Sequence, residues 1–314
     1  MKLLETTGAK LVLFSSGSTG EAKAIVHDWE RLKQSFTKGN PYRTLAFFPL
    51  DHMAGINTFF RTMNSGGCLI IPQRKDPEYI CSIIEQFKVE LLPTTPTFLN
   101  LILISELYKK YDLSSLKIIT YGSEPMNEVI LKRLIEIFPQ VRFKQTYGLS
   151  ELGVFPTMSK DGTLWIKIGI NTRVRDGKLE LKTDSAMLGY INAPNPFTSD
   201  GWFMTGDRVE QEGEYFKILG RDSDFINVAG YKVNPVEVEN EIMKVKNVAN
   251  CVVYGECNGI TGQIVCANVE LINPEPDMDI IIRVRTHCID KLEKFKVPVK
   301  IRIETIKTGL KKLR

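Results

Sequence analysis

The chain contains one short stretch in which small polar residues stand close to a lysine. An apolar run at residues 11–14 precedes this stretch, and a second β-prone run at residues 24–27 follows it. The polar positions between the two runs include Ser15, Ser16, Gly17, Ser18, Thr19, Gly20 and Lys23. Glycines let the backbone turn several N–H groups toward one anion, and the hydroxyls and the lysine add donors and positive charge. The stretch therefore predicts a phosphate-binding loop, with an ordinary turn between two strands as the alternative.

The spacing within this stretch excludes a P-loop. The P-loop pattern G-x-x-x-x-G-K-[ST], counted from Gly17, places a glycine at position 22 and a hydroxyl at position 24. Ala22 and Ala24 occupy those positions, and no helix signal follows Lys23 directly.

Three further polar segments each follow an apolar, strand-like run. They are PLDH after residues 44–48, GSEP after residues 116–121, and TYGLSE around the end of the run at residues 141–145. Segments with helical spacing separate the strands, at residues 56–64, 77–87, 96–110 and 127–138. Strands that alternate with helices indicate an α/β fold with a doubly wound, largely parallel sheet, and ligands bind such sheets beyond the carboxyl ends of the strands. The three polar segments fall at those ends.

The sequence pattern changes at about Gly153. Short β-prone runs separated by turns continue to residue 219 and predict a small β-rich subdomain. The last ninety or so residues combine two β-prone runs with helical segments at 236–245 and 279–291, which predicts a separate α+β unit. We therefore expect a large domain over residues 1–220, with its β-rich part at about 153–220, and a small mobile C-terminal domain over residues 221–314.

Composition narrows the class of protein. The 314 residues are 43% apolar and 25% charged, and the net charge of +4 is too small to suggest a nucleic-acid partner. The six cysteines form no C-x-x-C pair, which is typical of reduced cysteines in a cytosolic protein. No apolar run is long enough to span a membrane, and the first residues lack a signal-peptide core. We expect a soluble, cytoplasmic protein.

The motifs occur in an order that resembles one family. From residue 11 to the end the chain contains SSGSTGEAKA, PLDHMAG, TYGLSE, GWFMTGD, GRDSDFINVAGYKVNPVEVE and a closing threonine–lysine tail. Together these motifs resemble the adenylate-forming superfamily of acyl-CoA and aryl-CoA synthetases, peptide-synthetase adenylation domains and luciferases. The resemblance implies an ATP- and Mg²⁺-dependent ligase that converts a small carboxylic acid to an acyl-adenylate and then to a thioester, with CoA as the thiol. Transfer to a carrier protein or an amine, and a degenerate nucleotide-binding module, are the alternatives.

The resemblance also implies roles for the nucleotide-binding residues. The loop at residues 15–20 and Lys23 would hold the β- and γ-phosphates, although Ala22 and Ala24 replace the usual proline and glycine. The strand-end turn that would lie against adenine consists of Gly122, Ser123, Glu124 and Pro125. In the TYGLSE motif, the nucleotide-binding residues would be Thr146, Tyr147, Gly148 and Ser150, with Tyr147 flat against adenine. Glu151 would bind Mg²⁺, which prefers carboxylate and phosphate oxygens.

Further residues receive roles from the later motifs. Asp207 would accept hydrogen bonds from both ribose hydroxyls, and Arg221 would reach the nucleotide. The hinge falls at residues 221–224, on Ser223, where the family more often has Asp or Lys, and the C-terminal domain would rotate about it. The channel for the thiol acceptor would be lined by Gly230, Tyr231 and Lys232.

Two catalytic residues complete the resemblance. His52 would position the carboxylate end of the acyl pocket. In the tail TIKTGLKKLR, spacing from Thr308 selects Lys312 as the catalytic lysine, whereas spacing back from Arg314 selects Lys311. Lys312 is our prediction, and its charge would stabilise the carboxylate and the α-phosphate during bond formation.

The start of the chain departs from the family pattern. Only about ten residues precede residue 11, where the family has a long N-terminal region. We expect a minimal member, a fragment or half of a split enzyme, with a homodimer or a partner chain replacing the absent region. The acyl pocket would then consist of residues 52–60, 95–101 and 122–149, with Phe59, Phe60 and Phe98 as its aromatic residues. No arginine or lysine stands out as a partner for a second carboxylate, so we expect a small aryl or short acyl acid.

Overall fold

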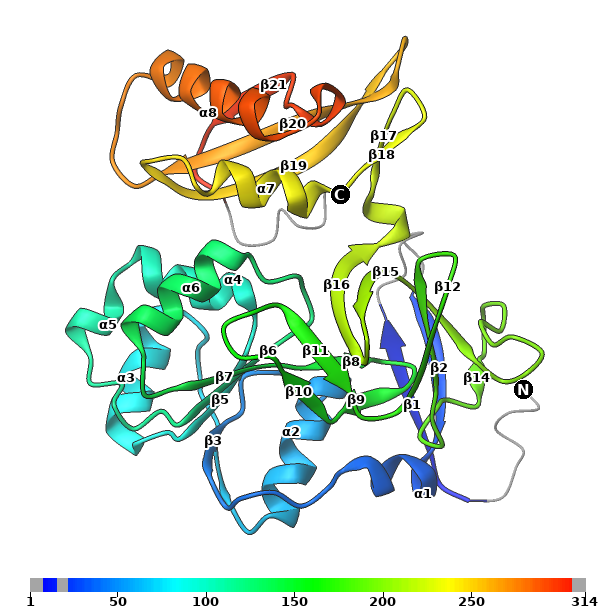
Figure 1. The fold of residues 1–314 in the computed structure, drawn as a ribbon. Helices are drawn as coiled ribbons and strands as arrows, with labels where there is room; N and C mark the ends of the chain where they lie inside the picture. Colours follow the sequence, from blue (N-terminus) through cyan, green and yellow to red (C-terminus); the bar gives the residue numbers. More distant parts are fainter. Residues whose placement is uncertain (1–7, 16–21, 307–314) are drawn as a thin grey trace. The chain divides into compact units, whose positions relative to one another are not determined.

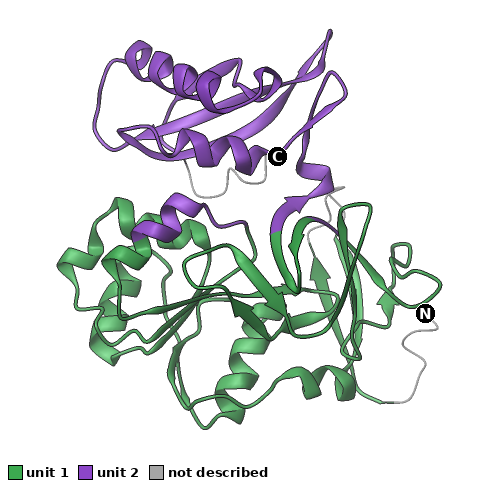
Figure 2. Ribbon diagram, viewed as in Figure 1, with its two compact units in different colours: residues 1–124, 134–205, 209–217 green, residues 125–133, 206–208, 218–314 purple. Residues whose placement is uncertain are grey.

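A computed structural model describes residues 8–15 and 22–306 of the chain (Figure 1). The chain divides into two compact units (Figure 2). The first unit comprises Met1–Glu124, Leu134–Thr205 and Val209–Lys217, and the second comprises Pro125–Arg133, Gly206–Arg208 and Ile218–Arg314. Assignment of the second unit as a mobile lid remains a prediction.

A five-stranded parallel sheet forms the centre of the first unit. Its strand order is β4-β3-β5-β6-β7, with bounds β3 (Arg43–Leu45), β4 (Cys68–Ile70), β5 (Leu91–Thr94), β6 (Ile118–Tyr121) and β7 (Arg142–Gln145). The connecting helices are α2 (Met53–Asn64), α3 (Pro77–Phe87), α4 (Pro96–Ile104), α5 (Leu107–Lys110) and α6 (Glu128–Ile137), of which residues 128–133 of α6 belong to the second unit. The predicted doubly wound parallel sheet is confirmed.

The strand order determines where a ligand can enter this sheet. From β3 the chain moves to β4 on one side, and it then crosses back over β3 to reach β5 on the other side. Because crossovers between parallel strands are right-handed, α2 lies on one face and α3, α4 and α5 lie on the opposite face (Figure 1). Such a reversal opens a crevice beyond the carboxyl ends of the strands. His52 follows β3 at this point.

The helices begin and end where local chemistry requires. Asp76 caps α3 by accepting a hydrogen bond from the Tyr79 N–H at 2.9 Å, and Pro77 occupies the first turn. The predicted helix at residues 96–110 is wrong as a single element. Glu106 has a φ of 52°, which ends α4 and starts α5 in a new direction.

The rest of the first unit is rich in strands. A six-stranded sheet has the order β10-β11-β16-β15-β13-β12, and its members are β10 (Thr157–Ser159), β11 (Trp165–Ile168), β12 (Asn171–Arg175), β13 (Lys178–Lys182), β15 (Phe203–Glu212) and β16 (Tyr215–Arg221). Residues 206–208 of β15 and 218–221 of β16 belong to the second unit. Strands β8 (Tyr147–Leu149) and β9 (Gly153–Phe155) form a short antiparallel pair. A three-stranded sheet joins β1 (Lys10–Ser15), β2 (Lys23–Asp28) and the distant β14 (Gly189–Tyr190).

The second unit has its own sheet. Four strands follow the order β18-β17-β20-β19, and β21 pairs with β20 in parallel. The strands are β17 (Ile226–Val228), β18 (Tyr231–Val233), β19 (Val248–Asn258), β20 (Gly262–Leu271) and β21 (Lys300–Ile303), and the helices are α7 (Pro235–Ile242) and α8 (Asp277–Lys291). Residues Val238, Val253 and Ile280 are fully buried in the core of this unit. This agrees with the predicted α+β fold.

None of the helices in the described part of the chain has both the length and the apolarity needed to cross a membrane.

Candidate functional site

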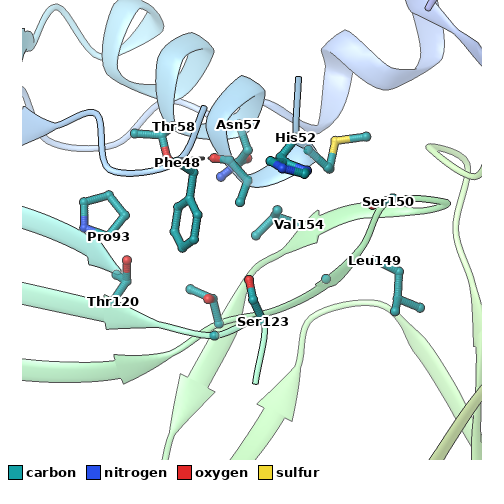
Figure 3. A pocket seen from close by; sticks show the side chains of 15 residues that line it. Phe48, His52, Asn57, Thr58, Pro93, Thr120, Ser123, Leu149, Ser150 and Val154 are labelled. Atoms are coloured by element: carbon teal, nitrogen blue, oxygen red, sulfur yellow. Dashed lines mark hydrogen bonds between the residues drawn. The ribbon is translucent and has the colours of Figure 1, made fainter. Parts of the chain in front are cut away.

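A cavity of about 340 Å³ lies beyond the carboxyl ends of the parallel strands in the first unit (Figure 3). Its volume is at the lower end of the range for small-molecule sites. The residues that line it include Phe48, His52, Met53, Asn57, Thr58, Pro93, Thr120, Gly122, Ser123, Thr146, Gly148, Leu149, Ser150 and Val154. Most of them come from α2 and the segment before it and from the segments after β6 and β7, while Pro93, Thr120 and Val154 come from β5, β6 and β9. The structure therefore brings together the segments PLDH, GSEP and TYGLSE.

Close backbone packing holds the turns after β6 and β7 side by side. A Cβ atom added to Gly122 would lie 2.5 Å from Thr146 Oγ1 and 2.9 Å from its carbonyl oxygen. The Thr146 N–H donates to the Tyr121 carbonyl at 2.8 Å. Only glycine fits at position 122 without displacing the neighbouring turn. Ser123, which lines the cavity, has a φ of 69° and is a strained residue of the kind found at functional sites.

Other residues of these two motifs lie outside the cavity lining. Glu124 Oε1 accepts a hydrogen bond from the Thr97 N–H at 2.5 Å, at the first turn of α4. The Tyr147 side chain is buried, with 8% of its surface exposed, and neither Tyr147 nor Pro125 contacts the cavity. The adenine-facing roles of these three residues remain predictions.

His52 lies directly before α2 and lines the cavity (Figure 3). Its side chain is 62% exposed and its Nε2 atom lies 3.8 Å from Asp51 Oδ1. The three expected pocket aromatics, in contrast, do not line this cavity. The Phe60 ring packs at 5.2 Å on Trp29, Phe59 packs on Phe60, and Phe98 packs on Phe47. Phe48 provides the aromatic ring of the cavity instead.

Tyr190 connects the expected phosphate lysine with the expected metal ligand. The Lys23 ammonium lies 5.4 Å from the centre of the Tyr190 ring, which is a cation–π distance. The hydroxyl of the same tyrosine donates a hydrogen bond to Glu151 Oε1 at 2.6 Å. Lys23 and Glu151, which are far apart in sequence, therefore share one neighbour. Ser15 ends β1 on the same hairpin, whereas Ser16, Gly17, Ser18, Thr19 and Gly20 lie outside the described residues.

Two more side chains attach this hairpin to the site. Asn192 accepts a hydrogen bond from the Ala24 N–H at 2.9 Å and donates to the Ala22 carbonyl at 2.8 Å. His27 is fully buried on β2, and its Nε2 atom lies 2.7 Å from the Ser150 carbonyl oxygen. We call His27, Tyr190 and Asn192 the hairpin clamp. No local sequence signal identifies these residues, because their partners are more than 30 positions away.

His27 of the hairpin clamp should make the folding stability depend on pH. Burial lowers the pKa of His27 below its usual value of 6.5, although the Ser150 carbonyl and the Glu151 charge oppose this shift. The folded chain therefore keeps His27 neutral where the unfolded chain binds a proton, and folding stability should fall as the pH drops below about 6.5. The free energy of unfolding, measured by urea titration from about pH 7.5 to 5, should decline with an extra slope of up to about 1.4 kcal/mol per pH unit. His27→Gln should remove that extra slope.

His52→Gln is the matched control for this experiment because the side chain of His52 is exposed. It should keep the pH dependence of the wild type. An unchanged slope in His27→Gln would show that His27 does not cause the effect.

The second unit contains the residues matched to the ribose and hinge positions. Asp207 is 6% exposed and forms an ion pair with Arg221, at 2.8 Å between Oδ1 and Nε. Asp222 Oδ1 contacts Arg208 and also lies 2.9 Å from Lys232 Nζ. The carboxylates at 207 and 222 are thus held by cations from the same unit.

Ser223 lies in a short 3-10 turn at Asp222–Asp224, where its hydroxyl donates to Asp224 Oδ1 at 3.1 Å. The Tyr231 ring stacks on Phe295 with 4.6 Å between ring centres. Gly230 has a φ of 90° in the turn between β17 and β18, which suits glycine. The tail residues Lys311 and Lys312 lie outside the described residues.

The donor set of the site fits Mg²⁺ bound with phosphates rather than a metal held by protein alone. The described residues contain no cluster of three or more His, Cys, Asp or Glu side chains that could hold a metal. Mg²⁺ in nucleotide sites is held by one or two carboxylates together with phosphate oxygens and water. Glu151, with Lys23 nearby for the phosphates, matches that arrangement.

Sequence comparison decides the family. Residues 9–184 match the model of a family described as AMP-binding enzyme, and residues 237–312 match that of the AMP-binding enzyme C-terminal domain. The chain belongs to the AMP-binding enzyme family. This confirms the resemblance to the adenylate-forming superfamily that the motifs indicate.

Curated relatives of this AMP-binding enzyme are distant. It is 30% identical to acyl-CoA synthetase 7 of Caenorhabditis elegans over 343 residues, and this match covers 96% of this chain and 63% of the relative. It is 26% identical over 310 residues to 4-coumarate--CoA ligase-like 6 of Oryza sativa subsp. japonica, covering 82% of this chain and 52% of that one. The AMP-binding enzyme spans about half the length of several curated relatives that it matches, at 47–53%.

Solved structures share the fold of this AMP-binding enzyme. The anthranilate CoA ligase AuaEII in complex with anthranoyl-AMP superposes with a TM-score of 0.81 at 22% identity, covering 95% of this chain and 64% of that one. The amide bond synthetase McbA from Marinactinospora thermotolerans gives a TM-score of 0.80 at 23% identity, with 95% and 65% covered.

Proposed function

We propose that this AMP-binding enzyme is an ATP- and Mg²⁺-dependent ligase that activates a carboxylic acid as an acyl-adenylate and transfers the acyl group to CoA. The observation that carries the proposal is the shared contact of Lys23 and Glu151 with Tyr190. A cation for the phosphates and a carboxylate for Mg²⁺ are thereby fixed near one another. The curated relatives named as CoA ligases and acyl-CoA synthetases support the same reaction class.

The reaction has two steps. A carboxylate oxygen of the acid attacks the α-phosphorus of ATP, the bond to the pyrophosphate oxygen breaks, and acyl-AMP and pyrophosphate form. The CoA sulfur then attacks the acyl carbon, the thiol proton passes to solvent, and AMP leaves with the electrons of the carbon–oxygen bond. Mg²⁺ neutralises phosphate charge when bound.

The residues of the chain have separate tasks in this proposal. Lys23 and the hydroxyl-rich loop hold the phosphates, and Glu151 supplies the carboxylate for Mg²⁺. Ser123, Thr146 and Ser150 line the cavity in which the acid and the α-phosphate meet, and His52 lies at its edge. Asp207 and Arg221 bind the ribose and the nucleotide, and Lys312 stabilises the charge that forms on the reacting oxygens.

The acceptor step belongs to the second unit in this proposal. The C-terminal region rotates about Ser223 and presents Gly230, Tyr231 and Lys232 to the thiol. A carrier protein or an amine in place of CoA is the alternative acceptor. The reaction takes place in the cytoplasm.

ATP–pyrophosphate exchange tests the proposal. With Mg²⁺ and a panel of carboxylic acids, the wild type should exchange label in an acid-dependent manner, and Lys312→Ala should lose about 100-fold or more of that exchange. Lys311→Ala is the matched control, and a loss confined to that variant would move the catalytic role to Lys311. Exchange that no acid promotes would reject adenylation. Thioester formation measured with CoA and with a carrier protein then identifies the acceptor.

A further inference from the structure

A second cavity, of about 150 Å³, also lies within the first unit, next to the first cavity. It lies between α2 and the face of the parallel sheet that α2 covers. The residues that line both cavities are Asn57, Thr58, Pro93, Thr120, Thr146 and Val154. The two cavities therefore adjoin each other at these six residues.

Two positively charged side chains line the second cavity. Arg61 comes from α2 and Lys144 from β7, and both are half-buried. No aspartate or glutamate lines this cavity, and neither cation forms an ion pair with any of the described residues. Two cations thus share a pocket that contains no carboxylate.

The backbone explains why the two cations meet. Asn57 and Arg61 are four residues apart on α2, so they lie on one face of the helix. Lys144 is in register with Thr120 on β6, and Thr120 is in register with Pro93 on β5. Residues in register share a face of the sheet. Arg61 from α2 and Lys144 from β7 therefore both lie in the layer between α2 and the sheet.

The positive charges of Arg61 and Lys144 repel each other in the second cavity. Burial lowers the pKa of Arg61, and burial together with the charges of Arg61 and Arg142 lowers the pKa of Lys144. Partial burial of two like charges is costly unless an opposite charge is supplied. The nearby hydroxyls do not supply one, because Thr58 and Thr62 donate to carbonyls of their own helix.

We propose that Arg61 and Lys144 bind a second carboxylate of the substrate, so that the acid this protein activates is a dicarboxylic acid. The proposal rests on the proposed adenylation function. One carboxylate lies near His52 and Ser123, where it reacts, and the other lies between the two cations. Asn57, which lines both cavities, contacts the connecting part of the molecule. The proposal departs from the expectation that no arginine or lysine stands out as a partner for a second carboxylate.

The chemistry of the two side chains suits this role. The guanidinium of Arg61 can bind a carboxylate with two parallel hydrogen bonds, and the ammonium of Lys144 adds a point charge. A methyl group in place of the second carboxylate would leave both cations without a partner. A site of that type discriminates strongly against the analogue that lacks the polar group.

Paired acids test this proposal by isothermal titration calorimetry on the full chain. Each diacid is compared with the acid that has a methyl group in its place: succinate with butanoate, glutarate with pentanoate, adipate with hexanoate, and terephthalate with 4-methylbenzoate. We expect at least one diacid to bind about 10- to 100-fold more tightly than its partner. Arg61→Leu and Lys144→Met should each abolish most of that preference.

Arg175→Met is the matched control, since Arg175 is an exposed cation at the end of β12. It removes the same charge and should keep the preference. Equal affinities within every pair, a preference that persists in both cavity variants, or no diacid binding at millimolar concentration would overturn the proposal.

ATP–pyrophosphate exchange with the same acids separates this proposal from adenylation. Exchange promoted equally by methyl acids and diacids would leave adenylation standing and reject the dicarboxylate site. Arg61-dependent diacid binding without any exchange would support the site and reject adenylation.

Discussion

Glu151→Gln should reduce acid-dependent ATP–pyrophosphate exchange by about 100-fold or more, because the amide cannot supply the negative charge that holds Mg²⁺ at the phosphates. The fold should be unaffected. Tyr190 donates its hydroxyl hydrogen to Glu151 Oε1 at 2.6 Å, and the amide oxygen of glutamine can accept the same hydrogen bond. Initial exchange rates, measured across a range of Mg²⁺ concentrations, check this expectation. A higher Mg²⁺ requirement in the variant would identify the metal step.

Two variants make the result interpretable. Glu214→Gln is the control for a charge change, since Glu214 is exposed and forms an ion pair with Lys167. It should exchange like the wild type. Tyr190→Phe removes the hydrogen bond to Glu151 but keeps the aromatic ring near Lys23, so an intermediate loss is expected. Wild-type exchange in Glu151→Gln would show that Glu151 is not the metal ligand.

Gly55→Ala should destabilise the first unit by about 1–3 kcal/mol or more. Alanine in a helix is ordinarily better than glycine by about 1 kcal/mol, so the expected sign is opposite to the usual one. The reason is the backbone of the preceding turn. A Cβ atom on Gly55 would lie 1.9 Å from the Pro49 carbonyl oxygen and 2.6 Å from its carbon. These are backbone atoms, which a side-chain rotation cannot move.

The displacement should also reach the cavity of the first unit. Gly55 is in the first turn of α2, three residues after His52, so a shift of this turn moves the edge of the cavity. Urea unfolding and pyrophosphate exchange should therefore both worsen. Gly259→Ala is the control, because nothing lies within 4 Å of its Cβ position. A change of about 0.5 kcal/mol or less is expected there. Equal stability of Gly55→Ala and the wild type would contradict the clash.

Local signals in the sequence are sufficient for the central sheet. Asp76 and Pro77 fix the start of α3, which covers residues 77–87 as predicted. The apolar runs that become β3, β6 and β7 are each followed by a polar segment, so the position of the cavity beyond the strand ends was predictable. The break in the predicted helix at residues 96–110 was not, because Glu106 carries no glycine-like signal for its positive φ.

The parts of the site that depend on contacts between residues far apart in the sequence could not be predicted. Tyr190 and Asn192 follow no pattern that places them beside residues 22–24, and β14 is only two residues long. Arg61 and Lys144 are ordinary surface-type residues in the sequence. They share a cavity only because right-handed crossovers place α2 over the face of β5, β6 and β7.

The pairing of β14 with β2 has a consequence for synthesis. Tyr190 and Ile25 are neighbours in the sheet, and the amide group of Asn192 bonds to Ala22 across 170 positions. At about 5–20 residues per second, a ribosome needs roughly 10–30 s to make the chain between them. During that time β2 has an open edge, and such edges are where chains aggregate. Strand β2 of a nascent chain therefore acquires its second neighbour late, after the central parallel sheet has already been translated.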